Sequence, residues 1–312
     1  MPEQLLNPDS AARTGGTPSP GPGSAVPPGF EVLRIPSRAA GWGGSLSRIL
    51  GFGGKTLFLK SYFRDHLIGA GVDDPETLRS GPLVAGWIGG GRTHHALIRA
   101  EGEAWVLKAY RRGGLVGRWN STRYWGRGRF LEELRVAALA EREGIPTAEV
   151  LAVIIERAGL GSVRAWLVTR YLPEMRPLHE YFGAPEEGEI FRTAGQVVRG
   201  MHKVGIDHPD LHVGNIVGGL DRNGPHAHIV DWDRARLRSK GTWSPNVNLI
   251  RLWRSVEKGR SEGAVRYFKA ALRAFIRGYF EGRPSALRDA RKYFRRRAFF
   301  LGLRIWLWRA RR

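Results

Sequence analysis

The chain has 312 residues, 42% of them hydrophobic, which is enough apolar material for a sizeable core. Lys and Arg total 50 against 29 Asp and Glu, and the net charge of +21 indicates an anionic partner such as nucleic acid, acidic phospholipid or a phosphorylated glycan. The absence of Cys excludes disulfides, thiolate metal sites and a thiol nucleophile.

The N-terminal part of the chain is predicted to lie outside the main fold. Residues 1–29 are rich in Pro, Gly, Ser and Thr, and we expect a disordered tail with no signal peptide. Residues 30–80 are predicted to be an N-terminal extension. Within it, residues 46–63 mix apolar and basic side chains but are interrupted by glycines, so we expect two short amphipathic pieces that either pack on the domain or contact a membrane.

Residues 81–173 are predicted to form a small sheet lobe. Short apolar runs around glycines, with a turn at Glu101 and Gly102, are typical of antiparallel strands. The segment FLEELRVAALAEREG then has helical spacing of apolar residues and should end at Gly144. Two more strands, in VLAVIIER and SVRAWLVTRY, are expected to complete the lobe.

Residues 174–287 are predicted to form a larger, helical lobe. Its clearest helix is EIFRTAGQVVRGMHKVG, which has one apolar face and a natural C-terminal cap in Gly205. The order of sheet lobe, hinge and helical lobe predicts a two-lobed α+β fold. A basic amphipathic helix over residues 288–312 is expected to follow.

The segment HPDLHVGNIV carries the first catalytic candidates. Asp210 precedes Asn215 by five positions, and an apolar strand further on presents Asp231 at its end. Phosphoryl transfer depends on positioning and on neutralisation of charge, with a carboxylate to accept the hydroxyl proton and Mg²⁺ to bridge the phosphates. We therefore predict Asp210 as the base, and Asn215 and Asp231 as ligands of Mg²⁺.

A cation for the nucleotide phosphates is predicted upstream. Lys108 lies in AWVLKAY, inside an apolar strand, and a buried Lys requires an anionic partner. Glu133 on the following helix can form that ion pair and fix the ammonium toward the phosphates, and Glu132 is the competing assignment.

Three further features leave alternatives open. The cluster Gly89, Gly90 and Gly91 either covers the nucleotide phosphates with backbone N–H groups or forms a plain turn. His208 is expected to support the loop backbone rather than to act as a base. The arginines crowded between residues 111 and 129 either contact the substrate or belong to a solvated loop.

These motifs together resemble a known family. HPDLHVGN resembles the kinase catalytic loop, IVDWD the metal-binding aspartate segment, and WVLKAY the nucleotide-lysine strand. With YRRGGLVG, RFLEELRVAALAEREGIP, VDWDRAR and NVNLIRLWRSVEK, the chain is similar to the lipopolysaccharide kinase family, especially its 3-deoxy-D-manno-octulosonic acid (Kdo) kinases, over roughly residues 80–260. The resemblance implies a protein-kinase-like fold, ATP and Mg²⁺ as cofactors, and a Kdo hydroxyl of the inner core as acceptor. In the family register the helix glutamate is Glu133.

The acceptor and the C-terminal segment imply a location. A lipid-linked inner-core glycan lies at a membrane, and the apolar and aromatic residues of 288–312 recur at helical spacing between Arg clusters. We expect a peripheral protein on the anionic, cytoplasmic side of the bacterial inner membrane. The alternative is that this helix packs on the lobe.

Other functions remain as alternatives. A kinase for heptose or another small acceptor would share the same catalytic residues. A nucleic-acid-binding protein would explain the charge of +21 but not the joint presence of Lys108, Asp210, Asn215 and Asp231, so no nucleic acid is expected as a partner. A pseudokinase scaffold is disfavoured because the full set of catalytic side chains is present.

Overall fold

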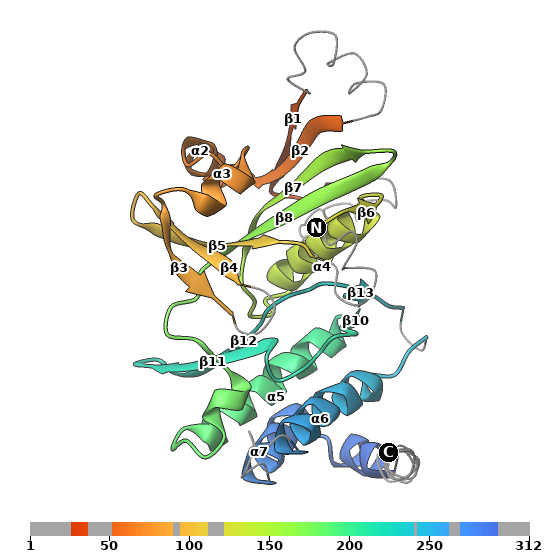
Figure 1. Cartoon of the computed structure of the whole chain (residues 1–312). Helices are drawn as coiled ribbons and strands as arrows, with labels where there is room; N and C mark the ends of the chain where they lie inside the picture. The colour runs from red at the N-terminus through yellow and green to blue at the C-terminus, as the bar shows by residue number, and fades with distance from the viewer. Residues whose placement is uncertain are drawn as a thin grey trace, which may run out of the picture.

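The described part of the chain forms two stacked lobes (Figure 1). The computed structural model describes residues 26–36, 52–89, 94–111, 122–239, 242–261 and 269–292. Most of the predicted disordered tail, and the pair Gly90 and Gly91, therefore lie outside the described residues.

The sheet lobe is built on one antiparallel sheet with the strand order β1-β2-β7-β8-β5-β4-β3, and β6 pairs with β8. The strands are β1 (Phe30–Ile35), β2 (Phe52–Lys60), β3 (Val84–Ile88), β4 (His95–Ala100), β5 (Glu103–Ala109), β6 (Tyr124–Trp125), β7 (Val150–Gly159) and β8 (Ser162–Arg170). The strands predicted on either side of the helix are confirmed as β3, β4, β5, β7 and β8. The predicted turn is also confirmed, since Glu101 and Gly102 have φ values of 51° and 81°.

The predicted N-terminal extension belongs to this same sheet. β1 pairs with β2, β2 pairs with β7, and the short helices η1 (Ser61–Phe63), α2 (Arg64–Gly69) and α3 (Pro75–Ser80) follow. Leu57, Phe58 and Leu59 on β2 are all buried. Residues 52–60 form the strand β2, covered on both faces, rather than an amphipathic piece, and residues 61–63 form η1. This part of the chain packs on the domain, which was one of the two expected alternatives, and residues 46–51 lie outside the described residues.

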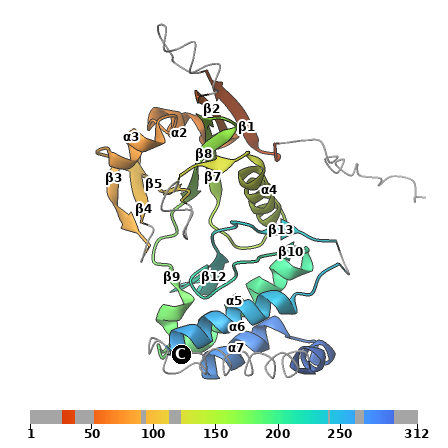
Figure 2. The ribbon, with the colours of Figure 1, turned by 45° about the vertical axis from the view of Figure 1, so that its right-hand side comes forward.

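Both faces of the sheet are buried. Helix α4 (Gly128–Arg142) covers one face, and α2 and α3 cover the other (Figure 2). Along β7, Val153 and Ile155 join the core that includes α4, whereas Leu151 and Ile154 join the second core. The predicted helix is thus confirmed, and the chain turns at Gly144 with a φ of 68°.

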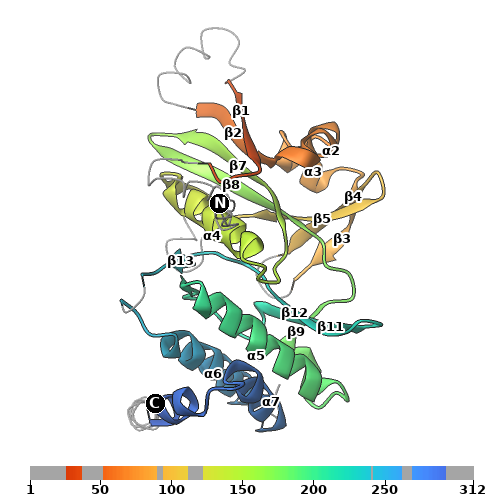
Figure 3. The ribbon, with the colours of Figure 1, turned by 180° about the vertical axis from the view of Figure 1, so that it is seen from behind.

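The helical lobe is arranged around one long helix. It contains η3 (Leu178–Tyr181), α5 (Glu187–Lys203), α6 (Asn246–Ser261) and α7 (Lys269–Tyr279). Helix α5, which confirms the clearest predicted helix, lies between α7 and a small sheet of order β12-β11-β9 (Figure 3). These strands are β9 (Arg176–Pro177), β11 (Ile216–Asp221) and β12 (Gly224–Ile229), while β10 (Ile206–Asp207) pairs with β13 (Arg236–Leu237). Of these strands, only the apolar one before Asp231 was predicted; it is β12, which ends at Ile229, two residues before Asp231.

Helices α5 and α7 approach each other more closely than side chains would permit. A Cβ at Gly195 would collide with the backbone carbonyl of Phe275, and one at Gly278 would collide with that of Arg192. Glycine at both positions therefore fixes α7 against α5.

The chain continues past α7 into a helical stretch over residues 284–292. This stretch contains the start of the predicted C-terminal helix, and residues 293–312 lie outside the described part. Within the described residues, no helix is both long and apolar enough to cross a bilayer.

Candidate active site

The two lobes are tied together beside the predicted catalytic residues. The backbone N–H of Ile229 donates to the Pro146 carbonyl at 3.0 Å, and the Thr147 hydroxyl donates to the Ile229 carbonyl at 2.8 Å. The Trp232 indole N–H in turn donates to the Thr147 hydroxyl at 2.8 Å. The loop that ends α4 thereby holds the strand that leads to Asp231.

Four side chains of the helical lobe support the loop that carries Asp210. They are His202, Asp207, Asn248 and Tyr279, and we call them the helical-lobe network. Asn248 is completely buried; its carbonyl oxygen accepts the backbone N–H of residue 208 at 3.0 Å, and its amide donates to Asp207 at 2.9 Å. The two ring nitrogens of His202 lie 2.7 Å from the Tyr279 hydroxyl and 3.1 Å from Asn248 Oδ1. Burial lowers the pKa of His202 to about 4, so the ring is neutral.

Asp210 and Asn215 are joined across the loop. Asp210 is exposed, and its backbone carbonyl accepts a hydrogen bond from the Asn215 amide at 3.1 Å. Asn215 itself is buried, and its backbone carbonyl accepts the backbone N–H of Val230 at 2.9 Å. This second bond places Asp231, the next residue, beside the loop.

Lys108 and Asp231 meet between the lobes. The Lys108 ammonium lies 2.6 Å from Asp231 Oδ1, and their side chains are 18% and 36% exposed. Burial disfavours both charges, but their attraction outweighs it, so the pKa of Lys108 is raised and that of Asp231 is lowered. Asp231 also adopts a φ of 63°, an uncommon conformation for a non-glycine residue.

Glu133 lies in the same place but has a different partner. The Tyr110 hydroxyl donates to Glu133 Oε2 at 2.6 Å, while Oε1 is buried and has no hydrogen-bond partner among the described residues. Burial, opposed by Lys108, raises the pKa of Glu133 to about 7. The predicted ion pair with Lys108 is not formed in the described part of the chain, because the ammonium bonds to Asp231. We call Lys108, Tyr110, Glu133 and Asp231 the interlobe cluster.

The competing glutamate lies elsewhere. Glu132 is 41% exposed and pairs with Arg135 on the outer surface of α4. Glu133, on the inner surface, is only 1% exposed. Of the two, the structure brings Glu133 to the site.

Arg129, in the first turn of α4, anchors the aspartate segment. Arg129 Nε lies 2.6 Å from Asp233 Oδ1, and a second guanidinium nitrogen bonds to the other carboxylate oxygen. The Arg129 guanidinium also lies over the Tyr124 ring, 5.3 Å from its centre. This paired bond couples α4, which carries Glu133, to the segment that carries Asp231.

The remaining predicted residues are placed as follows. Gly89 ends β3 with a φ of 98°, and the other two glycines of the cluster lie outside the described residues. Arg112 and Arg118 are also outside them. His208 is completely buried, with its ring 5.6 Å from the Trp232 ring, and neither ring nitrogen has a hydrogen-bond partner among the described residues, so its supporting role stays a prediction.

Several site residues were missed by the sequence reasoning. Tyr110, Asn248 and Asp233 act through contacts that only the fold creates. Their nearest signals were the Tyr in WVLKAY, the Asn in NVNLIRLW and the second Asp in DWD. His95 on β4 was also missed; burial and the nearby Lys108 lower its pKa to about 4.

The residues present are suitable for Mg²⁺ only in combination with a ligand. No group of three or more acidic or histidine side chains in the described ranges forms a metal site by itself. The Asp231 carboxylate and the side-chain carbonyl oxygen of Asn215 are hard donors. Mg²⁺ commonly takes one or two protein ligands, with phosphate and water as the rest. Together with Lys108, the arrangement can bind a phosphate-bearing nucleotide.

Comparisons with known proteins agree with this geometry. The family model described as "Lipopolysaccharide kinase (Kdo/WaaP) family" matches residues 87–279. A 3-deoxy-D-manno-octulosonic acid kinase of Xanthomonas oryzae pv. oryzae (strain PXO99A) is 34% identical over 207 residues, covering 62% of this chain and 82% of that protein. One of Xylella fastidiosa (strain 9a5c) is 30% identical over 244 residues, covering 72% and 96%.

A likeness to a solved structure extends to the fold. The structure described as "WaaP in complex with acyl carrier protein" superposes with a TM-score of 0.52 at 17% sequence identity, and covers 79% of this chain and 95% of that one. This likeness confirms the predicted two-lobed, protein-kinase-like architecture.

Proposed function

The chain belongs to the lipopolysaccharide kinase (Kdo/WaaP) family, and we propose that it transfers a phosphoryl group from ATP to a Kdo hydroxyl of the lipopolysaccharide inner core. Membership makes it a phosphotransferase that acts on a sugar hydroxyl in lipopolysaccharide biosynthesis. The observation that carries the proposal is the meeting of Lys108 and Asp231 at 2.6 Å beside the loop of Asp210 and Asn215.

Each residue of the site has a part in the proposed reaction. The Lys108 ammonium binds the nucleotide phosphates, and the Asp210 carboxylate accepts the proton of the attacking sugar hydroxyl. Asn215 and Asp231 hold Mg²⁺, which neutralises phosphate charge when it is bound. The helical-lobe network keeps the Asp210 loop in place, so the base needs no reorganisation before transfer.

The interlobe cluster changes partners when the nucleotide binds. In the structure Asp231 neutralises Lys108, and a nucleotide phosphate would take over that role. Asp231 is then free to bind the cation, and the Glu133 carboxylate becomes the protein anion next to Lys108. The unpartnered Oε1 of Glu133 is the atom available for that contact.

Support for a Kdo acceptor comes from relatives and from charge. The relatives named Kdo kinase are 30–36% identical to this chain. Kdo bears a carboxylate, and Arg111 and Arg127 are exposed at the ends of the elements that carry Lys108 and Glu133. A guanidinium forms paired hydrogen bonds with a carboxylate, whereas neutral heptose offers no such group.

The test is a comparison of acceptors. Purified protein with ATP and Mg²⁺ is offered a Kdo-bearing lipid A precursor, a heptose-bearing glycan or no acceptor, and the products are mapped by mass spectrometry. We expect phosphate on Kdo only, formed far more slowly by Asp210→Asn. Phosphate on heptose alone would assign the site to the alternative acceptor.

We also propose that the enzyme works at the cytoplasmic surface of the inner membrane. Residues 293–312 contain Arg and aromatic residues but no Asp or Glu, a composition suited to an anionic interface. Removing them should weaken binding to anionic vesicles and turnover of a bilayer-embedded acceptor, while a water-soluble acceptor is still phosphorylated. Unchanged vesicle binding by the folded, truncated protein would mean that the segment packs on the lobe.

A further inference from the structure

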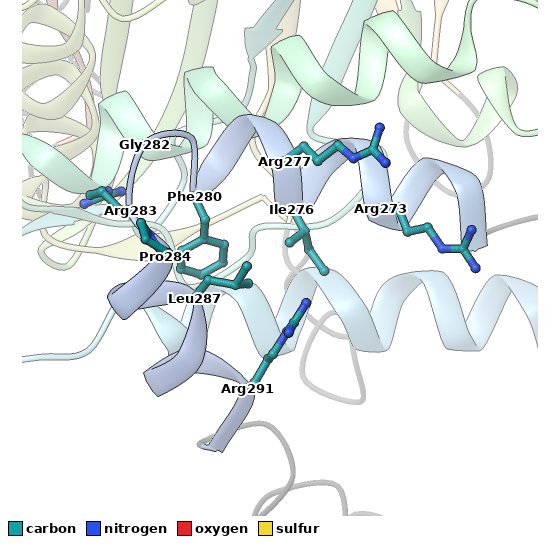
Figure 4. A pocket seen from close by; sticks show the side chains of 9 residues that line it. All are labelled: Arg273, Ile276, Arg277, Phe280, Gly282, Arg283, Pro284, Leu287 and Arg291. Atoms are coloured by element: carbon teal, nitrogen blue, oxygen red, sulfur yellow. The ribbon is translucent and has the colours of Figure 1, made fainter.

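A pocket lies on the helical lobe, and none of the described residues that line it belongs to the candidate active site. Its volume is about 560 Å³, and its walls come from α7 and the helical stretch over residues 284–292 (Figure 4). Side chains of two kinds line it: four arginines, and the apolar residues Ile276, Phe280, Pro284 and Leu287. The proposed kinase reaction uses none of them.

The packing of α7 explains why this face is open. Its buried residues, Ala271, Phe275, Gly278 and Tyr279, belong to one stripe, and α7 is pressed against α5 at the glycine crossing described above. The stripe that lines the pocket is the other one, where Arg273, Ile276, Arg277 and Phe280 recur at helical spacing.

The described side chains that line the pocket carry only positive charge. Its arginines are Arg273, Arg277, Arg283 and Arg291, and no Asp or Glu is among the described residues that line it. The nearby Glu281 is engaged elsewhere, since it pairs with Arg192 and Gln196 on α5.

Arg283 is held by the lobe itself. One of its guanidinium nitrogens donates to the Tyr279 carbonyl at 3.3 Å. Its Nε is buried and has no hydrogen-bond partner in the described part of the chain. Because this nitrogen is already shielded and the Arg283 side chain extends away from Phe280 and Leu287 (Figure 4), a phosphate in the pocket would meet the exposed Arg273, Arg277 and Arg291 instead.

The apolar floor restricts what that anion is. Ile276, Phe280 and Leu287 are each half-buried and side by side in the pocket. A small inorganic anion would leave them in water, whereas a phosphate that carries an acyl chain would cover them.

We propose that this pocket binds one anionic phospholipid, with the phosphate on the arginines and the first part of an acyl chain on the apolar floor. The proposal rests on the membrane location given under the proposed function and refines it: the enzyme would recognise a lipid at a defined site in addition to the diffuse attraction of its basic surface.

The first experiment separates a site from diffuse charge. Binding of the full chain to phosphatidylcholine vesicles with or without phosphatidylglycerol is measured for Arg273→Gln/Arg277→Gln/Arg291→Gln. The matched control removes the same charge from exposed arginines elsewhere, as Arg34→Gln/Arg99→Gln/Arg222→Gln. We expect the pocket variant to lose roughly tenfold more affinity for the anionic vesicles than the control does. Equal losses would overturn the proposal.

The second experiment separates a lipid from a free anion. Calorimetry compares short-chain phosphatidylglycerol, below the concentration at which it forms micelles, with inorganic phosphate. We expect the lipid to bind about tenfold more tightly or better, and Leu287→Ala to weaken the lipid but not phosphate. Equal binding of the two, or no effect of Leu287→Ala, would exclude a lipid site.

A third measurement keeps this proposal apart from the kinase proposal. With a water-soluble Kdo acceptor the pocket variant should turn over like the unsubstituted chain, and its melting temperature should be unchanged because the three arginines are exposed. Loss of turnover or of stability would show that the arginines serve the fold. If the unsubstituted chain fails on that acceptor, the kinase proposal fails and the vesicle comparison still stands.

Discussion

The interlobe cluster and the helical-lobe network are both buried and polar, yet their hydrogen bonding is of opposite character. In the network, Asn248 bonds to the His202 ring, to Asp207 and to the loop backbone, and the His202 ring has partners for both nitrogens. In the cluster, Glu133 has one buried oxygen with no partner among the described residues, and its pKa is raised to about 7. Buried polar groups that all have hydrogen-bond partners fix one geometry. Buried polar groups that lack a partner indicate a place where a ligand binds.

The largest expected effect is in the cluster. Asp231→Ala removes the carboxylate that neutralises Lys108 and is proposed to hold Mg²⁺, so Mg²⁺-dependent ATP binding should be lost. Calorimetry with and without Mg²⁺ measures it, and Asp289→Asn, an exposed carboxylate on the far side of the lobe, is the control. Unchanged metal-dependent affinity would remove Asp231 from the metal site.

The second largest effect is expected at Asp210, the proposed base, whose loop the helical-lobe network supports while its side chain stays exposed. Asp210→Asn should lower turnover by about 10² to 10⁴ while ATP affinity stays the same, because general-base catalysis is typically worth that factor. Single-turnover kinetics and a nucleotide titration on the same preparation separate the two quantities. Near-normal turnover in the folded variant would exclude Asp210 as the base.

Substitutions in the helical-lobe network should lower the stability of the fold rather than act on the phosphoryl transfer directly. Asn248→Ala leaves His202, the Asp207 carboxylate and a backbone N–H short of partners, and we expect a loss of roughly 3–5 kcal/mol in the free energy of unfolding. Asn246→Ala, on the same helix but only half-buried, should cost far less. If Asn248→Ala and Asn246→Ala unfold at the same denaturant concentration, the helical-lobe network does not stabilise the fold.

The smallest effect depends on pH. The folded pKa of Glu133, about 7, is above its unfolded value of 4.5, so the folded state binds more protons between these limits. Its contribution to stability is therefore present below about pH 4.5 and is lost as the pH rises to about 7, by roughly 3 kcal/mol at most.

Glu133→Gln should remove that loss and make unfolding less dependent on pH. Chemical unfolding at pH 5 and pH 8 measures it, with the exposed neighbour Glu132→Gln as the control. Identical pH dependence in both variants would place the Glu133 pKa near its ordinary value.

The sequence predicted the parts of the site that reside in short local patterns. Lys108, Asp210, Asn215 and Asp231 were found because each is part of a motif whose spacing has a chemical reason. Tyr110 and Asn248 were not, since a tyrosine and an asparagine in apolar segments have many uses. The bond between Arg129 and Asp233 joins residues 104 positions apart, and no local pattern indicates such a pair.

The fold was predicted with similar limits. Alternation of apolar residues and glycine turns identified β3, β4, β5, β7 and β8, and helical spacing identified α4 and α5. β2 was misread because its apolar run contains no alternation and its glycines suggested breaks. Such a run is typical of a strand buried on both faces, but only the neighbours β1 and β7 reveal that burial.

The strand order of the sheet also determines when the enzyme can take shape during its synthesis. β2 pairs with β7, and Lys108 on β5 is paired with Leu167 on β8, so early segments wait for partners made much later. One edge of β2 stays unpaired until β7 leaves the ribosome, and one edge of β5 until β8 does. The nucleotide lysine therefore acquires its final setting only when the whole sheet closes, and contacts of such long sequence separation form slowly.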